Sequence, residues 1–501
     1  MGLLCFSGGR VVSALAISYI GDLQRPSLTP MATQPTDSRA TIAAIATAAG
    51  VGGIAVIRLS GPETILISEK AFRPTNVLGA AASHTAHVGR FVDDSALVID
   101  EVVATVFRAP NSYTGEDVVE FSCHGSSLVA HKILYALLTF GARLAQPGEF
   151  TKRAFLNGRI DLAQAEAVAD LIGARSEMAR RASLDQLSGG MSKRIGALRD
   201  SLVSLVGLLE LELDFAEEEL ELVEGKHREH QIAHTISAID DLIGSYSAGR
   251  FVREGVRVVL AGGPNVGKSS ILNALLEEER AIVTDVPGTT RDVIEEGISI
   301  DGLQFVLSDT AGVRSTVDIV EQHGVERTEK KIENSDILLL VVDGSREPGE
   351  SELQSIARVL RKAKSASCEC IVVLNKMDLG LSEPKNGEFE QISGQFPKVR
   401  ISAKTGSGLD ELRESLVRVT HRGNMESAES GVLVTSLRHV EALAGAKSSL
   451  ERALRAAISR ESSEFIVVDL RAALDKLGEI IGLTTTDDIL NSIFSKFCIG
   501  K

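Results

Sequence analysis

The stretch GGPNVGKSS, residues 262–270, limits the folds open to this chain more than any other feature. The apolar run VRVVLA precedes it, and the helix-forming ILNALLEE follows it. A G-x-x-x-x-G-K-[ST] pattern between a strand and a helix predicts the phosphate loop of a parallel α/β domain. Its backbone N–H groups and the helix N-terminus would surround phosphate oxygens, while Lys268 supplies a cation and Ser269 a ligand for Mg²⁺.

Three further motifs follow in the order expected of a guanine-nucleotide site. DTAG ends a second apolar run; its Asp309 would hold the outer shell of the metal, and its Gly312 would offer an amide to the γ-phosphate. NKMD contains Asp378, whose carboxylate can accept both N1–H and the amino group of guanine, a donor pair that adenine lacks. SAK, residues 402–404, would complete the base pocket. These motifs together predict GTP binding.

The residue that orients the attacking water is not evident from these motifs. Ras-like proteins place a glutamine directly after DTAG, but this chain has Val313 there. Because valine cannot orient water, hydrolysis needs another donor or acceptor. Glu321 is a candidate, although the residue taken alone favours the interpretation that it is one of many surface glutamates without a role.

The pattern of apolar and polar residues changes several times along the chain, which predicts a multidomain protein of α/β and α+β class. Short β-branched runs such as GGIAVIRLSG and DVVEFSCHG indicate a small N-terminal α+β domain. Leucine and isoleucine then recur at spacings of three and four, as in Ile195, Leu198 and Leu202, which indicates amphipathic helices. Alternating strands and helices follow, before helical periodicity resumes. We therefore expect a helical domain interrupted by an inserted Ras-like P-loop domain, with boundaries at 1–40 (extension), 41–152 (α+β), 153–250 (helical), 251–422 (P-loop) and 423–501 (helical).

Composition narrows the classes of function. A net charge of -15 argues against a protein that holds nucleic acid by bulk electrostatics, so any such contact would need a local basic patch. Five irregularly spaced cysteines indicate a reducing compartment and no disulfide framework. No apolar run reaches the roughly 18 residues of a membrane-spanning helix.

Residues 1–40 precede the first strand-like pattern and have an uncertain status. The run VVSALAISYI is short, and only Arg10 precedes it as a cation. Met31 opens a polar stretch, so either Met1 or Met31 is the start. A mitochondrial targeting segment is the alternative, although arginine is scarce and Asp22 adds a negative charge.

The last eight residues, FSKFCIGK, admit two interpretations. Cys498 stands fourth from the end, as in a prenylation box, but lysine is a poor final residue for that box and no second membrane signal is present. The other interpretation is a thiol at a reaction site, although no histidine or other evident base lies near it in sequence.

GGPNVGKSS, PGTTRD (residues 287–292), SDTAGVR and the terminal FCIGK resemble the MnmE (TrmE) family of tRNA-modifying GTPases. The helical periodicity on both sides of the nucleotide motifs also resembles that of this family. The similarity covers nearly all of residues 41–501. It leaves the first 40 residues unexplained.

The resemblance implies a K⁺ ion beside the phosphates, where it would do the work of an arginine finger when two GTPase domains meet. The expected K⁺ ligands are Asn265, Thr284, Val286 and Thr289, and Thr290 would join Ser269 on Mg²⁺. The water-positioning glutamate of the family corresponds to Glu321, which favours its functional interpretation. The expected catalytic residues are Glu321, Asp309, Thr290 and Cys498. The expected GTP contacts are Asn265, Val266, Gly267, Lys268, Ser269, Ser270, Thr284, Asp285, Val286, Pro287, Gly288, Thr289, Thr290, Asp309, Thr310, Ala311, Gly312, Asn375, Lys376, Asp378, Ser402, Ala403 and Lys404.

The N-terminal domain resembles a module that binds tetrahydrofolate. The resemblance implies folate contacts at Arg58, Glu120, Arg159 and Lys501. Cations would meet the glutamate tail of the folate, and a carboxylate would pair with the amino-pyrimidine face of the pterin. The family commonly has lysine where this chain has Arg159, and the charge is kept.

The resemblance also implies a cytoplasmic homodimer that works with an FAD-dependent partner of the MnmG (GidA) family, in a complex of heterotetramer type. Together they would modify C5 of the wobble uridine, position 34, of certain tRNAs. A 5-formyl- or methylene-tetrahydrofolate would supply the carbon, and glycine or ammonium the amine, which gives a carboxymethylaminomethyl or aminomethyl group. The mitochondrial matrix is the alternative location if the extension is a transit segment.

Two alternative functions stay open at this point. A ribosome-assembly GTPase would share all the nucleotide motifs, but it would not explain the N-terminal module or CIGK. A folate-dependent transferase with a purely regulatory GTPase domain differs mainly in where catalysis is assigned.

Overall fold

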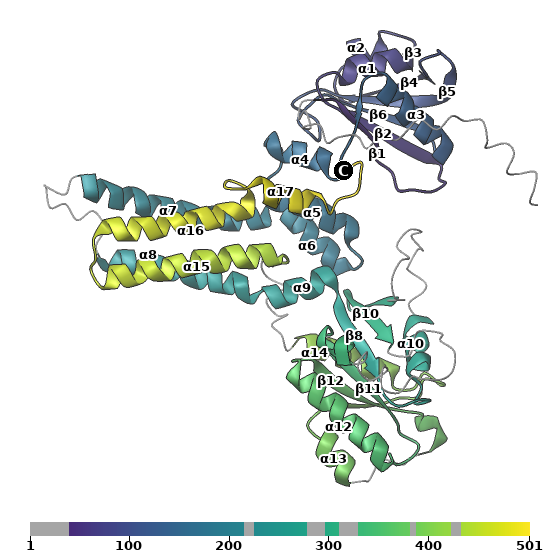
Figure 1. Cartoon of the computed structure of the whole chain (residues 1–501), viewed down its shortest axis with the longest axis vertical. Coiled ribbons are helices and arrows are strands. Elements are labelled where there is room, and N and C mark those ends of the chain that lie inside the picture. The colour runs from purple at the N-terminus through teal and green to yellow at the C-terminus, as the bar shows by residue number, and fades with distance from the viewer. Residues whose placement is uncertain (1–39, 215–224, 278–295, 310–328, 381–386, 422–431) are drawn as a thin grey trace, which may run out of the picture.

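A computed structural model describes residues 40–214, 225–277, 296–309, 329–380, 387–421 and 432–501. Three parts extend in different directions from a common centre (Figure 1). One is an N-terminal sheet with its helices, the second a rod of long helices, and the third a second sheet with helices on both faces. The last residue of the chain lies near the centre, between the first two parts. The expected mixture of sheets and helices is confirmed.

The N-terminal part is built on a seven-stranded sheet. Its order is β3-β4-β5-β6-β2-β1-β7, and all neighbours are antiparallel except β1 and β7. Hydrophobic residues that alternate along the strands pack under α1 and α3, around Phe72, Phe91 and Phe121. The elements are β1 (Ile42–Ile45), β2 (Ile54–Ser60), α1 (Thr64–Ala71), β3 (Phe72–Arg73), α2 (Val77–Ala80), β4 (Thr85–Val92), β5 (Val98–Phe107), β6 (Val118–His124), α3 (Ser127–Thr139) and β7 (Arg143–Leu144).

Four long helices form a bundle whose members come from both ends of the helical sequence. They are α7 (Gly190–Asp214), α8 (Gly225–Gly244), α15 (Leu437–Ile458) and α16 (Ser463–Ile481), with α15 against α16 and α8, and α16 against α7. The apolar stripe of α7, which includes Ile195, Leu198 and Leu202, is buried in the core of this bundle. Five shorter helices surround its inner end: α4 (Glu149–Leu156), α5 (Leu162–Gly173), α6 (Glu177–Leu187), α9 (Tyr246–Glu254) and α17 (Asp487–Phe494). The expected boundary between residues 152 and 153 lies within α4.

A buried ion-pair cluster joins α5 to the start of α15. Arg438 donates from Nε and Nη2 to the two carboxylate oxygens of Glu166, at 2.9 and 3.0 Å, and His439 Nε2 lies 2.8 Å from the same group. His439 is fully buried. Burial alone would raise the pKa of Glu166, but the charges and hydrogen bonds of His439 and Arg438 outweigh it and lower the pKa to about 2.

Glu166→Gln is expected to destabilise the helical part by about 3 kcal/mol at pH 7, and by less in acid. The pKa of Glu166 is lowered from 4.5, so its contribution is complete above that pH and is lost as the pH falls towards 2. Urea unfolding followed by far-UV circular dichroism at pH 7, 5.5 and 4 checks this. Glu210→Gln, in a more exposed pair with Arg471, is the control. A difference between Glu166→Gln and wild type that stays constant down to pH 4 would contradict the assignment.

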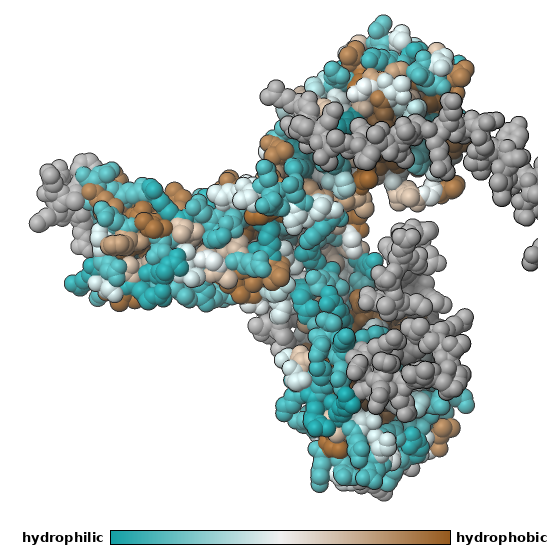
Figure 2. Space-filling view, in the orientation of Figure 1, coloured by the Kyte–Doolittle hydropathy of each residue, from teal (hydrophilic) through white to brown (hydrophobic). Residues whose placement is uncertain are grey.

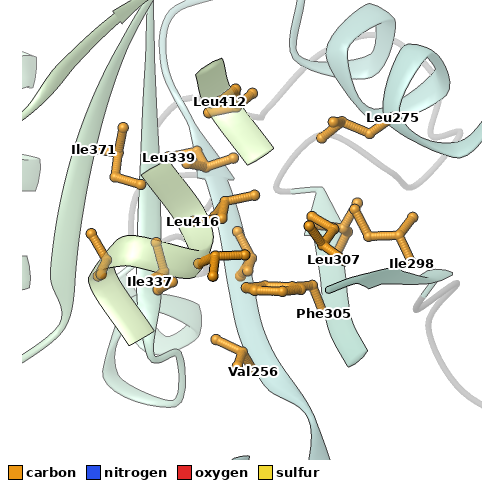
Figure 3. Close-up of a cluster of buried hydrophobic side chains, with 14 of the residues drawn as sticks. Val256, Leu275, Ile298, Phe305, Leu307, Ile337, Leu339, Ile371, Leu412 and Leu416 are labelled. Carbon is orange, nitrogen blue, oxygen red and sulfur yellow. The ribbon is translucent and has the colours of Figure 1, made fainter. Parts of the chain in front are cut away.

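The third part is a six-stranded sheet in the order β13-β12-β11-β8-β10-β9, parallel except for the β9-β10 hairpin. Every residue of β11 is buried, and alternate residues enter different cores, because helices cover both faces. We call the core on one face, under α10 and α14, the first core of this sheet. Figure 3 shows it, with Leu275 of α10 and Leu412 and Leu416 of α14. The elements are β8 (Val256–Ala261), α10 (Lys268–Glu277), β9 (Glu296–Ile300), β10 (Leu303–Asp309), β11 (Ile337–Asp343), α12 (Glu350–Ser365), β12 (Glu369–Asn375), η2 (Met377–Leu379), α13 (Gly387–Ser393), β13 (Lys398–Arg400) and α14 (Leu409–His421).

The first core of this sheet continues into the helical part. Ala179 of α6 and Ala248 and Val252 of α9 belong to the same buried cluster as the strands. The amide of Met178 also donates to Gly302 O in the β9-β10 turn, at 3.2 Å. The sheet is therefore packed against the helices that precede it.

The surface is mixed. On the face in Figure 2, hydrophilic residues alternate with hydrophobic ones along the long helices. Large apolar side chains that are exposed on the long helices include Leu211 on α7 and Phe465 and Val468 on α16. In the part of the chain that the structure describes, no helix combines the length and the apolar character needed to cross a membrane.

Candidate functional site

The phosphate loop joins β8 to α10 at the carboxyl edge of the second sheet. Lys268 opens α10, and its Nζ donates to the carbonyls of Gly262 and Gly263 at 3.0 and 2.8 Å. Gly267 has a φ of +98°, and a Cβ there would lie 2.2 Å from Asn375 Nδ2. Only glycine fits such a position without strain. The loop thus holds its lysine over a tight turn at a helix N-terminus, an arrangement that suits a phosphate group.

Asn375, at the end of β12, braces two loops of the nucleotide site. Its Nδ2 donates to Val266 O in the phosphate loop at 2.9 Å, and its Oδ1 accepts from the amide of Ala403 at 3.0 Å. The side chain is buried, with the residue 2% exposed. Because both ends of the amide are used, Asn375 fixes the relative position of the two loops.

Asp378 is exposed, and one of its two carboxylate oxygens accepts a hydrogen bond within the protein. Ser402 Oγ donates to its Oδ1 at 2.7 Å, and Ser402 itself is buried. No other described residue donates to this carboxylate, which belongs to the same base-pocket motifs as Asn375 and Ala403. A carboxylate of this kind can accept from the two adjacent donors of guanine.

Asp343 is a further candidate site residue that the sequence analysis did not single out. Its Oδ2 lies 2.7 Å from Lys376 Nζ, and its Oδ1 accepts from Ser345 Oγ at 2.6 Å. Burial raises the pKa of Asp343, but the hydrogen bonds from Lys376 and Ser345 outweigh it and keep the pKa below its usual value. The carboxylate thus positions Lys376. Its place at the end of the apolar run ILLLVVD, like that of Asp309 after its own run, was the available signal.

Several expected nucleotide and metal contacts lie outside the described residues. The side chain of Asp309 is among them, although its backbone ends β10 and pairs with Leu260, two residues before the phosphate loop. Ser269 is in the first turn of α10, where a hydroxyl can reach a metal on the phosphates. Asn265 has a φ of +60° within the loop. The expected residues outside the description are Thr284, Asp285, Val286, Pro287, Gly288, Thr289, Thr290, Thr310, Ala311, Gly312 and Glu321.

A second cluster of charged and aromatic groups lies on the N-terminal sheet. Arg58 of β2 and Glu120 of β6 are paired directly across the two strands, and Arg58 Nε donates to Glu120 Oε1 at 2.7 Å. The guanidinium of Arg58 lies 5.5 Å from the ring centre of Tyr113 and 5.7 Å from that of Phe150. Both charged side chains are about a quarter exposed, at 22% and 25%. The cluster combines a cation, a carboxylate and the partly exposed ring of Tyr113, which a ligand can reach, whereas Phe150 is fully buried behind the guanidinium.

The end of the chain is anchored beside this cluster. Phe494 and Phe497 are buried against α4 and α5. Gly500 has a φ of +103°, and a Cβ there would lie 2.3 Å from Ile45 O at the end of β1. Burial lowers the pKa of Lys501; the charge of Cys498 opposes this shift, and that of Arg58 adds to it. Cys498 is exposed. The structure therefore brings Lys501 and Cys498 near Arg58, which is more than 400 residues away in sequence.

Arg159 stands apart from the paired residues. It lies exposed in the turn between α4 and α5, with its Cγ next to Gly115. Tyr113 and Phe150 were not singled out in the sequence analysis. Because aromatic residues usually mark a core, only their proximity to Arg58 in three dimensions identifies them.

Comparisons with known proteins match both the N-terminal part and the rest of the chain to proteins of one family. The model described as GTP-binding protein TrmE N-terminus matches residues 41–159, and the model described as MnmE helical domain matches residues 162–498. A protein of Syntrophotalea carbinolica named tRNA modification GTPase MnmE is 44% identical over 462 residues, which cover 92% of this chain and 99% of the relative. One of Chlorobium phaeobacteroides with the same name is 46% identical over 468 residues, with 92% and 97% covered. The G domain of the T. maritima FeoB iron transporter aligns with 33% of this chain and 98% of its own at 30% identity and a TM-score of 0.24, too low to support an argument.

Proposed function

The chain belongs to the MnmE family of tRNA modification GTPases, and from this premise we propose how its two sites divide the work. The site on residues 251–422 hydrolyses GTP in a K⁺-dependent manner. The cluster on the N-terminal sheet holds a tetrahydrofolate. Together with an FAD-dependent partner of the MnmG (GidA) type, the protein adds a carboxymethylaminomethyl or aminomethyl group at C5 of the wobble uridine of certain tRNAs.

One observation carries this proposal: the chain end that bears Cys498 and Lys501 is anchored beside Arg58, far from the nucleotide site. A GTPase that only switches needs no such cluster. Arg58 and Lys501 offer cations to the glutamate tail of a folate, and Oε2 of Glu120, to which no described residue donates, suits the amino-pyrimidine. The partly exposed Tyr113 offers a face to its rings, and the buried Phe150 packs against the guanidinium of Arg58. Arg159 completes the proposed set from the neighbouring turn, and a reduced folate bound there would supply a one-carbon unit.

In the GTPase site, we assign one task to each of the following residues. Lys268 neutralises charge on the phosphates, Asp378 selects guanine, and Asn375 keeps the two loops in register. Ser269 and Thr290 would hold Mg²⁺, and Asp309 its outer shell. Asn265, Thr284, Val286 and Thr289 would hold K⁺, which supplies positive charge at the transferring phosphoryl group. Glu321 orients the attacking water, since Val313 cannot.

GTP hydrolysis in this proposal does not perform the tRNA chemistry. It switches the GTPase domains of a homodimer between separate and paired states, and the helical domain, into which each GTPase domain is inserted, carries the motion to the partner subunit. The acidic chain leaves most of the tRNA-binding surface to that partner. We place the complex, of heterotetramer type, in the cytoplasm.

GTP hydrolysis is expected to be at least about tenfold faster in KCl than in NaCl at equal ionic strength, because the smaller Na⁺ would not match ligands placed for K⁺. Steady-state phosphate release from the purified full chain measures this. Asn265→Ala is the matched variant and should lose the difference between the salts while it retains GDP binding. Equal rates in both salts would remove the assignment of Asn265 and the paired-domain mechanism together.

The nucleoside profile of tRNA from a deletion strain tests the function itself. Loss of the C5 group on wobble uridine, restored by the wild-type gene, is the expected result. Unchanged wobble uridines with altered ribosomal particles would instead favour a ribosome-assembly GTPase.

A further inference from the structure

The chain crosses between the helical part and the GTPase part twice, and the two crossings are packed together. The first runs through α9 into β8, and the second runs through residues 432–436 into α15. The amide of Val434 in the second crossing donates to Ser245 Oγ at 3.1 Å, just before α9. Gly249 of α9 lies so close that a Cβ there would be 2.1 Å from Val434 O. A displacement of the GTPase part would therefore move both crossings as one unit.

Helix α5 holds both crossings through carboxylates one turn apart. Asp170 accepts from Arg253 Nε, at the end of α9, at 2.9 Å. Glu166 accepts two hydrogen bonds from Arg438 and contacts His439, at the start of α15. Arg253 also reaches from the first crossing to Thr435 O in the second, at 3.5 Å.

The first turn of α5 supports the end of the chain. Leu162 and Ala165 are buried in one cluster with Phe494 and Phe497. Arg438 adds a second link, because it donates to the carbonyls of Glu479 and Ile480 at the end of α16, shortly before α17 and the chain end. Helix α5 is thus in contact with the segments that lead to the GTP site and with the segment that bears Cys498.

The ion pairs make this junction stiff. Glu166 and Asp170 sit among buried groups, and separating a buried charge from its partner leaves it uncompensated. A packed junction of this kind shifts as a whole instead of deforming gradually.

We propose that Glu166 is a positioning residue that, through Arg438, transmits movement of the GTPase part along α5 to the chain end beside Arg58. Its importance for tRNA modification rests on the function proposed above. The transmission itself does not, since it concerns only the nucleotide state and the position of Cys498.

The labelling rate of Cys498 reports this transmission in the full-length protein without tRNA or folate. Among the described cysteines Cys498 is exposed, whereas Cys123, Cys368 and Cys370 are buried, and mass spectrometry of the C-terminal peptide identifies its label. We expect the rate of maleimide labelling to change about fivefold between GDP and GDP with aluminium fluoride in KCl, the lower range of allosteric coupling. Glu166→Gln should reduce this change to less than about 1.5-fold, while basal GTP hydrolysis stays within about twofold of wild type.

Two comparisons separate transmission from simple loss of stability. Asp240→Asn breaks an exposed ion pair with Lys447, between α8 and α15, that does not involve α5, and it should keep the wild-type response at a temperature where all variants are folded. The double variant Glu166→Gln/Arg438→Gln should lose no more than Glu166→Gln alone, because the two residues act as one unit. A wild-type response in Glu166→Gln, or no response in the wild type, would overturn the proposal. A second outcome concerns the tRNA function alone. If Glu166→Gln loses the nucleotide-dependent labelling of Cys498 but a deletion strain keeps its wobble-uridine modification, only the tRNA function is refuted.

Discussion

Asp378→Asn is expected to weaken GTP binding by about 100-fold, because it replaces two charge-assisted hydrogen bonds to guanine that are together worth about 3 kcal/mol. Asp378 is suited to this bond because Ser402 holds Oδ1 at 2.7 Å and no described residue donates to Oδ2. The asparagine keeps the contact with Ser402 but turns the second oxygen into a donor. That donor would face the N1–H and amino group of guanine, so an acceptor is lost and an unfavourable contact is gained.

Xanthosine triphosphate distinguishes a change of specificity from damage to the pocket. Xanthine carries a carbonyl where guanine has its amino group, and that carbonyl can accept from the new amide. Asp378→Asn should therefore bind and hydrolyse xanthosine triphosphate better than GTP, as measured by nucleotide competition and phosphate release. Ser345→Ala, which removes one of the hydrogen bonds that hold Asp343, is a milder control that should keep the preference for GTP. Equal loss of both nucleotides would show that Asp378 supports the loop and does not read the base.

The nucleotide site could be foreseen from the sequence because each of its parts is a short motif at a strand end. Parallel strands put their carboxyl ends on one edge, so the strands before residues 262, 375 and 402 had to deliver their loops to one place. Two contacts could be found only in the structure: the hydrogen bonds of Asn375 to both loops and the ion pair of Asp343 with Lys376. A motif does not show which of its polar groups bind to other parts of the protein.

The second site could not be assembled from local pattern. Arg58 and Glu120 face each other only because β2 and β6 are neighbours in the antiparallel sheet, and the sequence does not reveal that order. Tyr113, Phe150 and the chain end come from three other segments. The resemblance to a family supplied Arg58, Glu120, Arg159 and Lys501, whereas the aromatic faces and the anchoring of Gly500 emerged from packing.

Cys498→Ser is expected to lower wobble-uridine modification by at least about 100-fold while GTP hydrolysis is unchanged, if the thiol bonds to the one-carbon unit during the reaction. A serine hydroxyl is isosteric but a far weaker nucleophile at neutral pH. The position of the thiol favours this role. It is exposed, and Phe494, Phe497 and Gly500 anchor the chain end that carries it. Lys501, which interacts electrostatically with Cys498, also interacts with Arg58.

Two variants of the same segment show whether the thiol or only its surroundings matter. Ser495→Ala changes an exposed hydroxyl three residues away and should leave modification intact. Gly500→Ala forces a Cβ against Ile45 O and should displace the segment, so that modification falls although Cys498 is present. Nucleoside analysis of tRNA from strains that carry each variant, with GTP hydrolysis measured on the purified proteins, provides both readouts. Full modification in Cys498→Ser together with loss in Gly500→Ala would make the thiol a bystander and assign the role to Lys501 and the path of the backbone, since the chain end would then act by position alone.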